Sequence, residues 1–189
     1  MKEFKNLMDI IKARRSIRQY SDRLVEDEKI KEIIEAARWA PSSSNSQCWR
    51  FVVVKDKYVK EQLVEKGLGG IIVPNEWIRT APVIIVACAQ LSFLTHRLGA
   101  TIKGIEYHLL DMGIAVEHLV LRATELSLGT CWIGWFNERR IRKVLKIPRS
   151  IKIVALVTLG YPAKELKLKE QQRLSLEEIL FLDKYGKSL

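Results

Sequence analysis

Residues 107–127, YHLLDMGIAVEHLVLRATELS, are the most informative stretch of the chain. Their polar side chains fall at intervals of seven, four and three and therefore form one stripe on an α-helix: Asp111, His118, Arg122 and Glu125. Nearly every other position is apolar or small, which predicts a helix buried around most of its circumference. A chain of 189 residues has little room for such a helix unless a second subunit covers part of it.

On both sides of this helix, hydrophobic spacing predicts alternating helices and strands. Residues 83–89 are apolar on both faces, as expected for a strand covered on both sides. Because hydrophobic strands are few and no linker or repeat interrupts the chain, we expect one α+β domain spanning residues 1–189. The predicted helices are 4–11, 27 to Pro41, 57–67, 107–127, 138–146 and 175–182, and the strands are 50–54, 83–89, 130–133 and 151–159.

Composition places the chain among ordinary globular proteins, with 48% hydrophobic and 29% charged residues. The longest apolar run, Ala81 to Ala89, is nine residues, far short of the ~20 that span a membrane. The first residues lack the apolar core of a signal peptide. Three cysteines without a CxxC pair fit a reducing compartment. We therefore expect a soluble, cytoplasmic protein with no membrane partner.

The chain carries 32 Lys and Arg against 22 Asp and Glu, a formal net charge of +10. Such a balance favours anionic partners but does not choose among nucleic acid, membrane surfaces and small phosphorylated molecules. Part of the excess surrounds the apolar stripe of the 138–146 helix, where a solvated face is the usual explanation and nucleic-acid binding a remote alternative. The basic residues there are Arg139, Arg140, Arg142, Lys143, Lys146, Arg149 and Lys152.

Familiar catalytic signatures are absent from the sequence: it contains no GxGxxG after a strand, no GxxxxGK[ST], no HExxH and no GxSxG. His96, His108 and His118 have no metal-ligand spacing with the cysteines. These absences argue against zinc chemistry, conventional hydrolysis and Rossmann-type nucleotide binding, and we expect no metal site.

Three stretches have the chemistry of a ligand site. Residues 14–18, RRSIR, place three guanidinium groups and a hydroxyl together without an acid, which suits a phosphate. The polar loop of residues 42–47 can hydrogen-bond the edge of a heterocycle. In residues 129–135, GTCWIGW, glycines near a strand end let the backbone approach a flat ligand. Taken singly, a solvated basic turn, a helix-ending loop and core tryptophans are competing explanations, and Cys131, His108 and His118 are typical structural residues.

Together and in this order, the features resemble the nitroreductase family of FMN-dependent oxidoreductases. The resemblance covers nearly the whole chain. Its motifs are RRSIRQY at 14–20, AAxxAPSSSNSQxWxF at 36–51, the central helix with Asp111, LGTCWIGWF at 128–136, LGYP at 159–162, and Arg173 before LEE.

The resemblance implies an α+β fold, a three-layer α/β/α sandwich with a mixed central sheet that forms an intertwined homodimer. Two FMN molecules lie at the interface of such dimers, each contacted by both subunits. By motif match, one subunit holds the phosphate, ribityl chain and pyrimidine with Arg14, Arg15, Ser16 and Arg18, and closes on the phosphate with Arg173. The other subunit contributes Ser42, Ser43, Ser44 and Asn45, while Ile133 and Gly134 place backbone groups beside N5. Gln47 is expected to support the loop.

The implied activity is ping-pong hydride transfer from NADH or NADPH, through the flavin, to a small-molecule acceptor such as a nitroaromatic, a quinone or a free flavin. The cofactor carries this chemistry, so no side chain is predicted to be catalytic. A reductive dehalogenase and a non-catalytic flavin-binding protein of the same fold are the alternatives.

The sequence departs from the family pattern in three places. Cys48 stands where proline is usual, and Gln171 stands where a lysine often precedes the tail arginine. Between Ala89 and Tyr107 the chain is short, so the helical insertion that walls the substrate pocket in larger members is expected to be missing.

Overall fold

A computed structural model of the chain describes residues 4–68, 76–91, 105–164 and 171–189. The strands are β1 (Trp49–Val54), β2 (Val83–Gln90), β3 (Gly129–Ile133) and β4 (Ile151–Gly160). The helices are α1 (Leu7–Ala13), α2 (Asp27–Arg38), α3 (Lys57–Leu63), α5 (Tyr107–Glu125) and α6 (Glu138–Leu145). Three short helical turns complete the described elements: η1 (Ser43–Asn45), η2 (Val64–Leu68) and η3 (Glu76–Thr80).

The four strands form one sheet in the order β1-β2-β4-β3, and every neighbouring pair is antiparallel. β2 lies inside the sheet, and all its residues but Gln90 are buried. This confirms the prediction from its apolar pattern. The mixed character implied by the resemblance is confined, among the described residues, to a single parallel bridge between Ser16 and Thr130.

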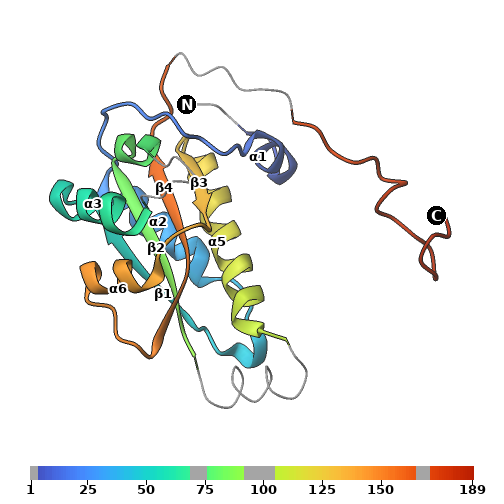
Figure 1. The fold of residues 1–189 in the computed structure, drawn as a ribbon. Coiled ribbons are helices and arrows are strands. Elements are labelled where there is room, and N and C mark those ends of the chain that lie inside the picture. The colour runs from blue at the N-terminus through green and yellow to red at the C-terminus, as the bar shows by residue number, and fades with distance from the viewer. Residues whose placement is uncertain (1–3, 69–75, 92–104, 165–170) are drawn as a thin grey trace.

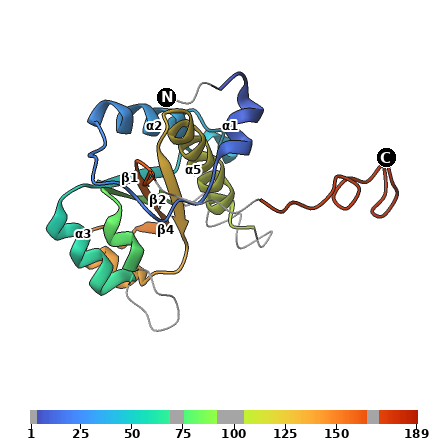
Figure 2. The same cartoon turned by 90° about the horizontal axis from the view of Figure 1, so that it is seen from above.

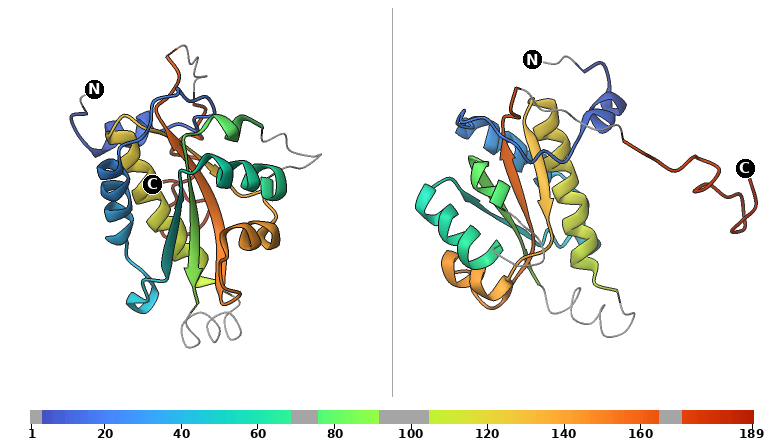
Figure 3. Two further views of the ribbon diagram at one scale, coloured as in Figure 1. Left: turned by 90° about the vertical axis from the view of Figure 1, so that its left-hand side faces the viewer. Right: turned by 45° about the horizontal axis from the view of Figure 1, so that its top comes forward.

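Helices cover both faces of the sheet, as Figures 1 and 3 show. α2 and α5 pack on one face, around a core that includes Ile33, Met112 and Leu119. α3, η2 and α6 pack on the other, around Leu63, Ile141 and Leu156. The predicted three-layer α+β sandwich is thereby confirmed.

A single chain buries only part of the circumference of α5, so burial of the rest stays a prediction that involves a second subunit. The buried side chains of α5 include Met112, Val116 and Leu119, whereas Leu110 is 57% and Ile114 40% exposed. The apolar side of α1 is exposed as well. No described residue covers these faces, since the apolar pattern exceeds what the four-stranded sheet and α2 can bury.

The helix predicted at residues 175–182 is wrong: the structure has a turn at 177–179 and a single β-bridge from Phe181 to Ser188 there. This tail extends away from the body of the protein (Figures 1 and 2), and its leucines are exposed. A helix this short is marginal in water without an apolar surface to pack on, which explains why the periodic pattern did not suffice.

Candidate functional site

The RRSIR stretch runs along the edge of the sheet. α1 ends at Arg14, and the chain continues in extended form, so that the Ile17 N–H donates to the Thr130 carbonyl at 2.8 Å. A Cβ added to Gly129 would lie 2.7 Å from Ile17 Cγ1. Only glycine permits this close approach. Two of the predicted site stretches therefore lie side by side, and we call residues 14–18 the arginine turn.

Tyr20 holds the arginine turn in place through a hydrogen bond to its backbone. Its buried hydroxyl donates to the Ile17 carbonyl at 2.6 Å and lies 2.6 Å from Thr158 Oγ1. Burial raises the pKa of Tyr20, so the phenol stays protonated and able to donate. Sequence reasoning assigned Tyr20 no role, although a tyrosine inside the RRSIRQY motif was a signal that it has one.

Arg14, Ser16 and Arg18 gather around Cys131. Burial raises the pKa of this thiol, and the two guanidinium groups and hydrogen bonds from Ser16 and Arg18 oppose the shift. The Arg18 guanidinium also lies over the Trp77 ring, 5.8 Å from its centre. Neither Arg14 nor Arg18 forms an ion pair with another described residue. Glu117 interacts electrostatically with Arg14 without forming an ion pair. Two guanidinium groups on this short segment suit an anionic ligand.

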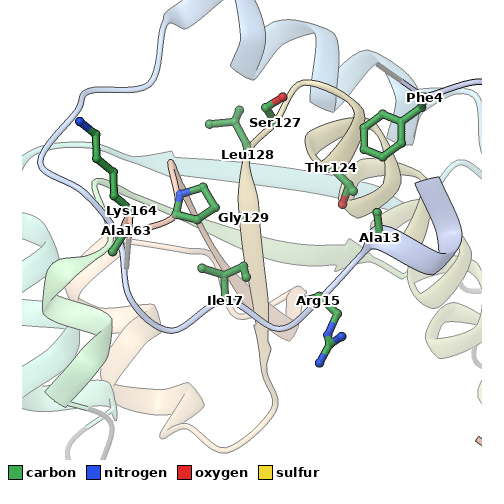
Figure 4. A pocket seen from close by; sticks show the side chains of 11 residues that line it. Phe4, Ala13, Arg15, Ile17, Thr124, Ser127, Leu128, Gly129, Ala163 and Lys164 are labelled. Carbon is green, nitrogen blue, oxygen red and sulfur yellow. The ribbon is translucent and has the colours of Figure 1, made fainter. Parts of the chain in front are cut away.

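Arg15 lies apart from this group. Together with Ile17, Thr124, Ser127 and Gly129 it lines a pocket of about 330 Å³ between α1 and the C-terminal end of α5. In Figure 4 its guanidinium points away from Thr124 and Ser127. This pocket is lined by Arg15 and Ile17 but not by Arg14, Ser16 or Arg18, and contact of Arg15 with a cofactor stays a prediction.

The C-terminal tail reaches the arginine turn through Gln171. Its side-chain amide donates to the Arg14 carbonyl at 2.8 Å and accepts a hydrogen bond from Arg173. Arg173, predicted to close on the phosphate, is thus tethered close to Arg14. The glutamine that replaces the usual lysine supplies this tether instead of a positive charge.

A strained polar loop, which we call the serine loop, covers residues 42–47. Ser44, Asn45 and Gln47 have backbone φ values of 51°, 52° and 44°. These lie in the left-handed region, which residues other than glycine rarely adopt. Non-glycine residues held there cluster at ligand sites. Gln47 braces the loop through hydrogen bonds from its backbone N–H to Ser42 and from its side chain to Asn45.

Asp111, on the first turns of α5, anchors the serine loop. Its carboxylate, 3% exposed, accepts hydrogen bonds from the Ser43 N–H at 2.9 Å and the Ser46 hydroxyl at 3.2 Å. Cys48 Sγ lies 3.9 Å from the same carboxylate. Burial, with a contribution from Asp111, raises the pKa of Cys48 to about 11. At neutral pH this thiol is therefore protonated and can donate where a proline could not.

β3, which pairs with the arginine turn near its start at Thr130, is followed by an open stretch of backbone. A Cβ added to Gly134 would meet no atom within 4 Å, so the main chain there is accessible. Ile133 is buried, whereas Trp135, one residue beyond Gly134, is 62% exposed. Backbone groups and an aromatic ring are thus available to a flat ligand at this strand end.

Within one chain, the serine loop and the arginine turn lie at opposite ends of α5 (Figure 1). Asp111 anchors the loop at the start of the helix, whereas Thr124, near its end, shares a pocket with Arg15. An α-helix rises about 1.5 Å per residue, so the two ends are about 20 Å apart. The predicted contacts of the two regions with one ligand therefore require two chains.

Two further findings concern the described part of the chain. No helix there is long and apolar enough to cross a membrane. In the same residues, no group of three or more His, Cys, Asp and Glu side chains is arranged to hold a metal ion. His96 and most of the short segment between Ala89 and Tyr107 lie outside the described residues.

Comparisons with known proteins show which family the chain is similar to. The sequence model of the Nitroreductase family matches residues 11–161. An NADH dehydrogenase of Thermus thermophilus is 34% identical over 178 residues, covering 80% of this chain and 84% of the relative. An FMN reductase [NAD(P)H] of Bacillus subtilis is 31% identical over a match that covers 79% of this chain and 63% of that protein. A nitroreductase family crystal structure from Clostridium novyi superposes with a TM-score of 0.75 at 33% identity, covering 97% and 96% of the two chains.

Proposed function

The chain belongs to the nitroreductase family, and from this premise we propose that it is an FMN-dependent NAD(P)H oxidoreductase. The observation that carries the proposal is the arginine turn: Arg14 and Arg18 place two positive charges on a short segment that pairs with β3, and neither forms an ion pair with another described residue. The backbone that follows β3 is open at Gly134. A phosphate and a flat ring are the two parts of FMN, and this arrangement suits both. The relative from Bacillus subtilis, whose name includes FMN and NAD(P)H, supports the same choice.

The proposed site needs a homodimer. The uncovered apolar face of α5, with Leu110 and Ile114, and the exposed side of α1 supply a surface for a second copy. If two α5 helices pack antiparallel, the serine loop of one protomer meets the arginine turn of its partner. We propose that residues 1–189 act as one domain and that two such domains bind two flavins.

In the proposed complex, one protomer binds the phosphate through Arg14 and Arg173, which Gln171 already holds together. Ser16 and Arg18 contact the ribityl chain and the pyrimidine, and the backbone at Ile133 and Gly134 approaches N5. The second protomer closes the site with the side chains and N–H groups of its serine loop, from residues Ser42, Ser43, Ser44 and Asn45.

When bound, FMN would supply the redox chemistry, namely hydride transfer from NADH or NADPH and reduction of an acceptor such as a nitroaromatic, a quinone or a free flavin. The side chains bind and orient. Arg18, held between Cys131 and Trp77, places a positive charge where reduction adds negative charge. No side chain is assigned as an acid or base.

The proposal is tested on the purified protein. We expect a yellow protein with a flavin spectrum, release of FMN on denaturation, and a mass in solution twice the 21.8 kDa of one chain. Mixed without oxygen, NADH or NADPH should bleach the flavin, and a nitroaromatic or quinone should restore the colour.

A colourless monomer that ignores added FMN would refute the proposal. A yellow protein that neither donor bleaches would instead be a flavin-binding protein without turnover. A protein that, once reduced, releases iodide from iodotyrosine faster than it reduces a quinone would be a dehalogenase.

A further inference from the structure

A groove separate from the proposed flavin site lies between α3 and α6. Both helices pack on the sheet face opposite α2 and α5 (Figures 1 and 3). The groove has a volume of about 560 Å³, and the partly buried Val59 and Val144 contribute apolar walls. Small-molecule sites typically range from about 300 to 1,000 Å³, so this groove has the size of a ligand site.

The charge around the groove is unbalanced. Lys66, Arg140 and Lys143 line it against a single acid, Glu65. Lys66 bonds the side chain of Gln62, and Arg140 Nη1 donates to the Lys66 carbonyl at 3.3 Å, so these contacts neutralise no charge. Within the part of the chain that the structure describes, Arg140 and Lys143 form no ion pair.

Away from the groove, one cation of α6 is paired with an acid. Glu138 pairs with Arg142 on the same helix and with Lys152 on β4, at 2.7 Å from the latter. The excess positive charge of this helix is thus directed partly at the groove, where it attracts an anion.

An aromatic ring stands beside these cations. Tyr58 lines the groove, and its ring is 72% exposed. An exposed ring can stack on a planar group of a ligand, and neighbouring cations can bind its phosphates. A ring wall, apolar sides and three cations together match a phosphate ester of a planar heterocycle.

We propose that the α3–α6 groove binds a small phosphate ester that carries a planar ring, of the class of a nucleoside diphosphate. Lys66, Arg140 and Lys143 bind its phosphates, and Tyr58 stacks on its ring. The site does not depend on the proposed flavin site, because it lies on the other face of the sheet.

Calorimetric titration of the protein with ADP, in the presence of saturating FMN, tests the site. We expect a dissociation constant below about 1 mM. Lys143→Met should weaken binding about tenfold, because a charged hydrogen bond to phosphate is lost. Arg149→Met removes the same charge from an exposed residue that does not line the groove, and binding should change less than about twofold. Tyr58→Ala should weaken ADP binding and leave pyrophosphate binding unchanged.

Several outcomes would overturn the proposal. Absence of binding at about 5 mM ADP would show that the groove is not such a site. Equal losses in Lys143→Met and Arg149→Met would show diffuse attraction by the net charge. Release of FMN during the titration would place ADP in the flavin site. Salt-sensitive binding of a single-stranded oligonucleotide, with both variants equally weakened, would indicate a nucleic-acid surface instead. Thermal unfolding of each variant checks that it is folded.

Discussion

The two ends of α5 are built on opposite principles. At its C-terminal end, the arginine turn concentrates charge on a regular, sheet-bound backbone, where Ile17 pairs with Thr130. At its N-terminal end, the serine loop carries no charge, and its shape comes from left-handed residues tied to the buried Asp111. One end offers strong attraction with ordinary geometry, and the other offers unusual geometry with weak attraction. The difference teaches that the attraction for a ligand and the shape of its site can come from separate segments. Within a single chain these two segments lie apart.

The largest expected effect is loss of the site through loss of the dimer. Ile114→Arg places a charge on the exposed apolar face of α5, and we expect a monomer without measurable FMN binding. Light scattering coupled to size exclusion measures the mass, and quenching of flavin fluorescence measures binding. Leu24→Arg, at a leucine that is 76% exposed before α2, is the matched control. A monomer that binds FMN normally would show that the residues at one end of α5 are enough to bind the cofactor.

Asp111→Ala tests whether geometry at the serine loop depends on one carboxylate. The buried carboxylate accepts hydrogen bonds from the Ser43 N–H, the Ser46 hydroxyl and, weakly, the Cys48 thiol, and their loss should lower the free energy of unfolding by about 3 kcal/mol. Urea denaturation measures the change, and FMN affinity should fall with it. Asp111→Asn keeps one oxygen acceptor and should lose less. Unchanged stability in the alanine variant would mean that the loop keeps its shape without this anchor.

Arg14→Ala tests the charged end. Loss of a hydrogen bond to a phosphate costs about 1.5–3 kcal/mol, which corresponds to a roughly 10- to 150-fold weaker FMN affinity. Fluorescence titration gives the dissociation constant, and Arg139→Ala removes an equal charge from α6 as a control. Unfolding should be little affected, in contrast to Asp111→Ala. Wild-type affinity would place the phosphate elsewhere.

Arg18→Ala should have the smallest effect and sharpens the role of charge at the same end. Removing a cation near the pyrimidine should lower the two-electron potential of bound FMN by about 30 mV for every ~1.4 kcal/mol lost. Equilibration with a reference dye during slow reduction measures the potential. Arg18→Lys, which keeps the charge, should restore most of it. An equal potential in wild type and Arg18→Ala would remove this role.

Local periodicity predicted most of the fold, because each helix and strand of the body carries its own pattern. The segment 83–89, apolar on both faces, became β2, and Pro41 follows the end of α2 at Arg38 as expected. The pattern failed where packing decides. Residues 175–182 are periodic but have no surface to pack on. α5 is apolar on a face that one chain leaves open, and burial of that face stays a prediction.

The site was only partly predictable, because its supporting contacts join residues far apart in sequence. Motifs identified the arginine turn and the serine loop as candidates. No pattern signalled that Tyr20 would meet Thr158, that Gln171 would tie the tail to Arg14, or that Cys48 would face Asp111. Each pair is separated by more than sixty positions, and only the fold brings it together.

The support beneath the arginine turn also has a direction. Tyr20 and Thr158 carry one hydroxyl proton each, but their hydroxyl groups make three contacts with oxygen atoms. Tyr20 contacts the Ile17 carbonyl, Thr158 lies 3.3 Å from the Cys131 carbonyl, and the two hydroxyls contact each other. Since the Tyr20 proton goes to Ile17, the 2.6 Å contact takes its proton from Thr158. The relay then runs one way, from strand to phenol to turn, and each link polarises the next. A methyl group in place of the Thr158 hydroxyl would therefore weaken the hydrogen bond from Tyr20 to the Ile17 carbonyl, in which Thr158 takes no direct part.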